Sequence, residues 1–123
     1  AAGGKNDSPE QEIQQVGDVR LLAVRHDGVD VKGLRVMLDR LRDKIGSGVV
    51  VVGGVHNDKA SILAGVTPDL VGTCHAGKLI AELAPMVGGK GGGKADMAQG
   101  GGTDTDSLDQ ALGAAAEKLQ AIQ

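Results

Sequence analysis

Residues 49–55, VVVVGGV, are the stretch that decides the fold. Four consecutive valines are β-branched, and such residues favour the extended backbone of a strand. The run is apolar without alternation, which indicates that both faces of the strand are buried. We therefore expect a central, doubly buried strand at this position.

The segments on either side of this run predict two more strands. A short turn at residues 56–58, HND, precedes residues 60–67, ASILAGVT, and so short a connection favours an antiparallel hairpin. Upstream, residues 18–28, DVRLLAVRHDG, contain a compact apolar run that predicts a strand closed by a turn at Asp27 and Gly28. The apolar residues of that run are Val19, Leu21, Leu22 and Val24.

Residues 30–46, between the first and the central strand, have the periodicity of an amphipathic helix. Asp30 is the expected N-cap and Gly46 the expected stop. The apolar positions, at i, i+3, i+4, i+7 and i+11, are Leu34, Met37, Leu38, Leu41 and Ile45. The opposite face is the most basic surface that the sequence offers, and we interpret it as a solvated helix face. Its charges are Lys32, Arg35, Arg40, Arg42 and Lys44 against Asp39 and Asp43.

Two further helices are expected in the C-terminal half of the chain. Residues 75–87, HAGKLIAELAPMV, predict a helix whose last turn Pro85 should end or kink. Residues 106–123, DSLDQALGAAAEKLQAIQ, predict a closing helix, with Ser107 and Gln110 at the spacing of a capping box.

The resulting order is strand–helix–strand–strand–helix–glycine loop–helix. It predicts an α/β fold in which a small mixed β-sheet is packed with helices. Residues 95–99, ADMAQ, could add a short edge strand. We expect a flexible leader or linker over residues 1–16 and a globular domain over residues 17–123. The chain starts without Met, and we expect it to be a piece of a larger protein.

Composition excludes several classes of function. The chain has no Phe, Tyr or Trp, so it cannot offer the aromatic rings on which single-stranded bases normally stack. Its net charge of −3 argues against a domain that binds nucleic acid through bulk positive charge, although a local basic patch is compatible with it. One cysteine excludes an internal disulfide and favours a reducing, cytoplasmic location. No apolar run approaches the ~20 residues of a membrane-spanning helix.

The glycine-dense residues 87–104, VGGKGGGKADMAQGGGTD, leave three interpretations open. A phosphate-binding loop fits Gly88, Gly93 and Lys94, but Ala95 stands where magnesium coordination needs a hydroxyl, and a helix rather than a strand precedes the motif. A flexible linker would tolerate the glycines and leaves the embedded KADMAQ unexplained. A glycine-lined concavity could bind an anion through backbone amides, with Lys90 and Lys94 at its rim.

Candidate catalytic and metal groups are few. Cys74 and His75 are adjacent in the sequence, so they do not face each other on a helix, and no zinc-like spacing supplies further ligands. We interpret Cys74 as a structural cysteine and residues 56–58 as turn residues. Three carboxylates are interpreted as charges at a helix N-terminus: Asp104, Asp106 and Asp109. We therefore expect neither a catalytic nor a metal site in this chain.

The glycine stretch also carries a resemblance. Together with the preceding HAGKLIAELAPM and the following LDQAL, it closely resembles the C-terminal end of bacterial alanyl-tRNA synthetases. The upstream residues 49–71 match the same domain, so the resemblance covers roughly residues 17–123. The family usually has Arg-Pro where this chain has Lys94 and Ala95. The domain is also similar to the substrate-binding domain that accompanies DHH phosphoesterases.

The resemblance implies a domain that binds alanine tRNA at its elbow, where the D and T loops meet, and so links aminoacylation with editing. The implied partners are this tRNA, the other domains of the parent synthetase and a possible second copy of the chain. The implied RNA-binding residues are Gly88, Gly89, Lys90, Gly91, Gly92, Gly93, Lys94, Met97 and Gln99. No cofactor is expected in the fragment; ATP, magnesium and zinc would serve other domains of the parent.

Two alternatives stay open beside this function. The domain could be mainly a dimerisation module of the same enzyme. It could instead be the nucleotide-binding or nucleic-acid-binding half of a DHH-type phosphoesterase, whose catalytic half is missing from the sequence.

Overall fold

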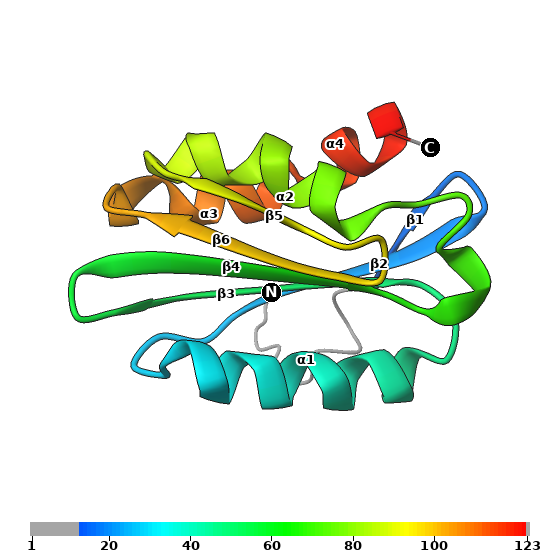
Figure 1. Ribbon diagram of the computed structural model, residues 1–123, viewed down its shortest axis with the longest axis horizontal. Helices are drawn as coiled ribbons and strands as arrows, with labels where there is room; N and C mark the ends of the chain where they lie inside the picture. The colour runs from blue at the N-terminus through cyan, green and yellow to red at the C-terminus, as the bar shows by residue number, and fades with distance from the viewer. Residues whose placement is uncertain (1–12, 123) are drawn as a thin grey trace, which may run out of the picture.

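The computed structural model describes residues 13–122, which form a six-stranded mixed sheet with helices on both faces (Figure 1). The strands are β1 (Ile13–Val16), β2 (Val19–Arg25), β3 (Val49–His56), β4 (Lys59–Val66), β5 (Lys90–Gly93) and β6 (Met97–Gly102). The α-helices are α1 (Val31–Ile45), α2 (Ala76–Leu83), α3 (Leu108–Gly113) and α4 (Ala115–Ile122). Three 3₁₀ turns complete the order: Pro68–Leu70, Ala84–Val87 and Thr105–Ser107. The predicted fold class, a small mixed sheet packed with helices, is confirmed.

The strand order across the sheet is β1-β2-β3-β4-β6-β5. Strands β2 and β3 are parallel and joined by α1, and every other neighbouring pair is antiparallel. The valine run lies in β3 near the middle of the sheet, and all four valines are fully buried. The prediction of a central, doubly buried strand is therefore confirmed.

Two hydrophobic layers sandwich the sheet. Helix α1 covers one face, and α2, α3 and α4 cover the other (Figure 1). Alternation along β3 separates the layers, because Val50 and Val52 pack toward α1 while Val49 and Val51 pack toward the three other helices. The apolar stripe of α1 is buried through Leu34, Leu38, Leu41 and Ile45.

Several local signals in the sequence form the structures that they predict. The Asp30 carboxylate accepts a hydrogen bond from the Gly33 amide and caps α1. Gly46 ends that helix with a φ of 76°. Asn57 and Asp58 both have positive φ, which is the geometry of a two-residue hairpin turn.

The N-terminal boundary of the globular domain differs from the prediction. Residues 13–16, assigned to the leader, form β1 and pair antiparallel with β2. Only Val16 of this edge strand is buried, so its sequence carries a weak hydrophobic pattern. The leader expected over residues 1–12 lies outside the described residues.

The two C-terminal helices are shorter than expected. Helix α2 ends at Leu83, and the turn that contains Pro85 continues as a 3₁₀ helix, as the proline predicts. The closing segment breaks between α3 and α4 at Ala114, directly after Gly113. The predicted capping box is wrong, since the Ser107 hydroxyl donates to Asp104 Oδ2 and makes no cap hydrogen bond.

The glycine stretch is not a loop between helices. It forms the β5–β6 hairpin, in which β6 pairs with β4 and β5 becomes the edge of the sheet. The short edge strand expected at residues 95–99 is therefore an inner strand, shifted to Met97–Gly102. This setting also excludes a phosphate-binding loop, because the G-x-x-x-x-G-K residues run into a strand and no helix begins at Lys94.

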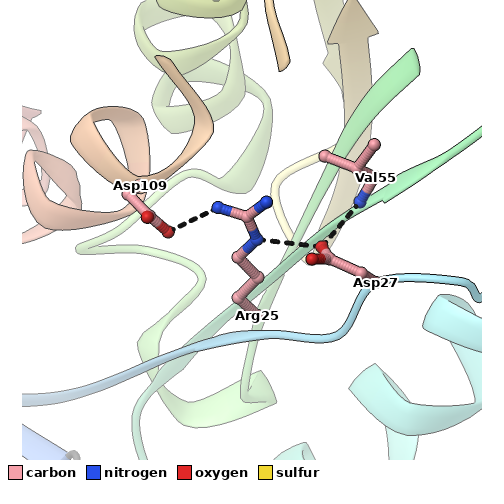
Figure 2. Close-up of polar contacts among 4 residues, drawn as sticks. All are labelled: Arg25, Asp27, Val55 and Asp109. Carbon is pink, nitrogen blue, oxygen red and sulfur yellow. Dashed lines mark hydrogen bonds and ion pairs between the residues drawn. The ribbon is translucent and has the colours of Figure 1, made fainter. Parts of the chain in front are cut away.

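A small ionic cluster ties the C-terminal end of β2 to α3 (Figure 2). Arg25 Nε donates to Asp27 Oδ1 at 2.8 Å, and Arg25 Nη1 donates to Asp109 Oδ1 at 2.7 Å. The Val55 amide donates to Asp27 Oδ1 at 3.0 Å. The hydrogen bonds from Arg25 and Val55 hold the pKa of Asp27 below its ordinary value, and the two carboxylates raise the pKa of Arg25. Arg25 therefore has a structural role, because its guanidinium is bound to Asp27 and Asp109.

Candidate nucleic-acid interface

Some glycines of the hairpin are required by its packing against α2. A Cβ on Gly91 would lie 2.5 Å from Gly100 Cα and 2.6 Å from Ile80 Cγ2. A Cβ on Gly77, in α2, would lie 2.5 Å from the Gly93 carbonyl oxygen. Real Cβ atoms do not approach other heavy atoms this closely. Gly77 therefore lets α2 meet the hairpin backbone directly, and Gly91 leaves room for the Ile80 side chain.

The first two glycines of the stretch also serve the fold. Gly88 adopts a left-handed φ of 75° and ends the 3₁₀ turn Ala84–Val87. Its amide donates to the Pro85 carbonyl, and the Gly89 amide donates to the Ala84 carbonyl. Both amides are occupied within the protein, so the anion nest that the sequence suggested does not fit them.

The face of the hairpin turned away from α2 leaves a glycine in open space. Side chains alternate along a strand, so Lys90 and Gly92 share the face of β5 turned away from α2, and Lys94, just after the strand, lines the same depression as Gly92. A Cβ on Gly92 would meet nothing within 4 Å, which makes Gly92 a bare point of backbone between two lysines. The expected pairing of a glycine surface with two lysine charges is therefore present at this one glycine.

Strand β5 also leaves backbone groups at the edge of the sheet. The Lys94 amide donates to the Met97 carbonyl, in register with the β5–β6 ladder. Hydrogen-bonded pairs alternate along an antiparallel ladder, so the backbone groups of Gly91 and Gly93 point away from β6. Both residues are exposed. At Gly93 the carbonyl on this outer side lies against Gly77 of α2.

A trough runs beside α1 over the uncovered part of the sheet. Helix α1 packs over β3 and β4, and β6 and β5 extend beyond it. Three adjoining shallow depressions of about 440 to 510 Å³ make up the trough. Its wall carries Val31, Lys32 and Arg35, and its floor carries Lys59, Ser61, Leu63, Lys90, Gly92, Met97, Gln99 and Gly101.

The trough concentrates positive charge in an acidic chain. It holds five of the 13 Lys and Arg residues but only two of the 16 Asp and Glu residues, Asp30 and Asp96. Asp30 is already engaged as the cap of α1. The five cations are Lys32, Arg35, Lys59, Lys90 and Lys94. This surface therefore matches a polyanion better than the net charge of the chain suggests.

Of the sequence-predicted residues, the trough gathers Lys90, Gly92, Gly93, Lys94, Met97 and Gln99. Gly88, Gly89 and Gly91 lie outside it. Sequence reasoning missed Lys59 and Ser61, and strand alternation could have found them, because they share the face of the partly exposed end of β4. Arg35 was expected only as part of a solvated helix face.

Arg42, also expected on that face, has a structural role instead. Its Nη1 donates to the Asp96 carbonyl at 3.2 Å, which ties α1 to the tip of the hairpin. Arg20 similarly donates to the Ile45 carbonyl. Of the five cations on the basic face of α1, Arg42 thus helps to hold the fold, and Lys32 and Arg35 line the trough.

The cysteine–histidine pair has structural roles. Cys74 is buried, and this burial raises the pKa of its thiol above the ordinary value. His75 Nδ1 accepts from the Lys78 amide and caps α2. Among residues 13–122 no three His, Cys, Asp or Glu side chains cluster as metal ligands would. In the same range, no helix has the length and apolar character needed to cross a bilayer.

Known proteins with related sequences share this domain. The family model of the DHHA1 domain matches residues 18–121. Alanine–tRNA ligase from Pseudomonas syringae pv. syringae is 47% identical over 112 residues, which is 91% of this chain and 13% of that protein. The enzyme from Roseiflexus sp. is 54% identical over 101 residues, 81% of this chain and 11% of that protein. The chain thus spans about an eighth of the length of these relatives.

A solved structure matches the fold as well. The C-Ala domain of alanyl-tRNA synthetase from Aquifex aeolicus superposes with a TM-score of 0.80 at 31% sequence identity. The match covers 88% of this chain and 97% of the solved one. The resemblance in the glycine stretch is therefore confirmed across nearly the whole domain, and the chain belongs to the DHHA1 family, with the fold of the C-Ala domain of alanyl-tRNA synthetases.

Proposed function

We propose that this domain binds alanine tRNA at the elbow through the hairpin face of the trough. The observation that carries the proposal is the bare backbone at Gly92 between Lys90 and Lys94, on the face of the hairpin turned away from α2. A folded RNA corner is recognised largely by shape and by its phosphates. Backbone without side chains allows close approach, and the two ammonium groups can meet phosphates.

The charge of the chain agrees with this mode of binding. Few phosphate contacts give a weak dependence on salt, so a domain of net charge −3 can bind RNA if its cations are gathered in one place. The absence of aromatic residues is compatible too, because binding to folded RNA does not require intercalated bases. Gln99, exposed on the floor of the trough, can donate and accept hydrogen bonds with RNA.

The parent protein in this proposal is an alanine–tRNA ligase acting in the cytoplasm. The isolated domain has no catalytic activity of its own, and ATP, magnesium and zinc serve other domains of the parent. By holding the far corner of the tRNA, the domain helps the aminoacylation and editing domains act on the same molecule. The marked match to alanine–tRNA ligases along 91% of the chain supports this assignment of the parent.

Filter binding with alanine tRNA, compared with a minihelix that lacks the elbow, tests the proposal. We expect tight binding only to the complete tRNA. The double variant Lys90→Ala/Lys94→Ala should weaken binding and flatten the salt slope by about one to two units, if each lysine meets one phosphate. Equal binding of the tRNA and the minihelix would contradict recognition of the elbow.

We propose a second copy of the chain as the other candidate partner. Strand β5 is an edge of the sheet with the outward backbone groups of Gly91 exposed, and such edges pair readily with another strand. A dimer formed through β5 would compete with RNA for the hairpin. Sedimentation across a wide concentration range tests this candidate, since a constant monomer would remove it.

A further inference from the structure

The trough extends well beyond the glycine hairpin. Along β6, the floor runs from Met97, which faces Gly65 across the ladder, to Gly102, which faces Ala60. These five residue steps of strand span about 17 Å. Lys90 lies opposite Gly101, which lies opposite Ser61, so two strand spacings, or about 10 Å, separate β5 from β4 across the floor. The trough is therefore long enough to follow several phosphates, since each strand of a DNA duplex carries one phosphate per about 3.4 Å of helix axis.

One end of the trough is basic for reasons unrelated to the glycine motif. Lys59 begins β4, directly after the Asn57-Asp58 turn, and Lys32 lies in the first turn of α1 across the depression. His56 ends β3 and lines the same depression. Within residues 13–122, neither lysine has an ion-pair partner within 4 Å. We call this group of Lys32, His56 and Lys59 the turn end.

The fold keeps the turn end and the hairpin on one continuous surface. Val31, Lys59 and Ser61 line both the depression at the turn end and the neighbouring one that reaches Lys90. Arg35, one helical turn after Val31, lies on the wall beside Gly92 and Lys94. Cations therefore line the trough along its whole length. The two carboxylates among them are Asp30, which caps α1 at the turn end, and Asp96 at the hairpin tip.

We propose that the turn end is a second phosphate-binding region, which holds the RNA backbone where it leaves the glycine hairpin. The inference rests on the proposed function and extends it, since Lys32 and Lys59 would add two phosphate contacts on the other side of the floor. Lys59 lies two residues, or about 7 Å, beyond Ser61, the residue across the floor from Lys90. An RNA bound only at the hairpin could pivot about that point. A second contact at this distance fixes its direction along α1.

The experiment is filter binding of the 123-residue chain to alanine tRNA between 50 and 300 mM salt, with three double variants. These are Lys32→Ala/Lys59→Ala at the turn end, Lys90→Ala/Lys94→Ala at the hairpin, and the control Arg40→Ala/Lys78→Ala. The control removes the same charge from the exposed side of α1 and from α2, outside the trough. Each phosphate contact contributes about 0.7 to 0.9 to the slope of log K against log salt. We therefore expect the turn-end variant to lose roughly 1.4 to 1.8 of slope and the control to keep the parent slope.

The outcomes separate the two proposals. If the hairpin variant weakens binding while the turn-end variant binds as the control does, the second region is refuted and the hairpin function stands. If the unmodified chain does not bind the tRNA, both fail. Competition with poly-glutamate provides another check. If poly-glutamate displaces the tRNA when both are present at the same concentration of negative charge, the trough binds any polyanion and the inference is overturned. Lys32→Arg/Lys59→Arg, which keeps both charges, should retain the slope.

Discussion

The strongest test of the packing argument compares alanine at two neighbouring glycines of β5. Gly91→Ala places a Cβ 2.5 Å from Gly100 Cα and 2.6 Å from Ile80 Cγ2. Gly100 Cα belongs to the backbone of β6 and cannot move without disturbing the pairing of β5 with β6. Gly92→Ala places its Cβ in open space on the other face. The two substitutions have the same chemistry, the same strand and opposite surroundings.

The expected magnitudes follow from these surroundings. Overpacking of this kind costs ~1–3 kcal/mol. Replacing glycine by alanine where the backbone permits it stabilises a protein by ~0.4–1 kcal/mol, since the unfolded chain loses freedom. Gly91→Ala should therefore be less stable than Gly92→Ala by ~1–3 kcal/mol. With about 4 °C of Tm for each kcal/mol in a domain of this size, a difference of about 2 kcal/mol appears as ~8 °C.

Thermal and urea unfolding followed by circular dichroism measure this difference, with Gly72→Ala as a control at an open site outside the hairpin. Stabilities of Gly91→Ala and Gly92→Ala that agree within about 0.5 kcal/mol would refute the packing explanation of the glycines. The same proteins separate folding from recognition. Gly92→Ala should fold normally and bind alanine tRNA more weakly, because its methyl group lies where the RNA is proposed to approach.

Three further predictions concern the rest of the fold. Thr67→Val should lower the free energy of unfolding, measured by urea unfolding, by ~1–3 kcal/mol. The buried Thr67 hydroxyl accepts a hydrogen bond from the Gly48 amide at 3.0 Å, and its loss leaves that amide without an acceptor. Thr67→Ser keeps the hydroxyl and should retain most of the stability. Arg25→Met should lower the free energy of unfolding by no more than ~1 kcal/mol at low salt and by less at 0.5 M salt, since the two ion pairs of Arg25 are partly exposed. A loss of stability that does not depend on salt would show that it does not come from these ion pairs. Hydrogen bonds from Ser47, and to a lesser extent from Thr67, lower the pKa of Asp69. The ionised carboxylate therefore stabilises the fold at a pH above its unfolded pKa of about 4, and this stabilisation is lost as the pH falls through the lower folded pKa. Asp69→Asn should make the free energy of unfolding less dependent on pH in this acidic range, and an unchanged dependence would exclude the effect.

Sequence reasoning succeeds where one local rule agrees with the tertiary structure. The valine run of β3 is buried on both faces, Asp30 caps α1, and the Asn57-Asp58 turn closes a hairpin. In each case the residue type has a strong preference that the rest of the fold leaves intact. The core of the sheet and the amphipathic face of α1 could therefore be predicted.

The glycine hairpin could not be predicted by the same rules. Glycine is depleted in strands, and a strand such as Lys90–Gly93 has no alternation of apolar side chains to reveal it. It forms because α2 approaches its backbone directly, which is a tertiary requirement that local propensity does not contain. The trough was missed for a related reason, since Lys59 and Lys90 lie on strands that only the sheet order brings together.

The direct contact between Gly77 and the Gly93 carbonyl has a mechanical consequence. The helix meets the hairpin through this backbone contact and through the Ile80 side chain, so a displacement of α2 passes directly into the hairpin that presents Lys90 and Lys94. The hairpin surface and the packing of α2 beneath it thus move together, so a substitution that weakens this packing would also make the hairpin surface less ordered.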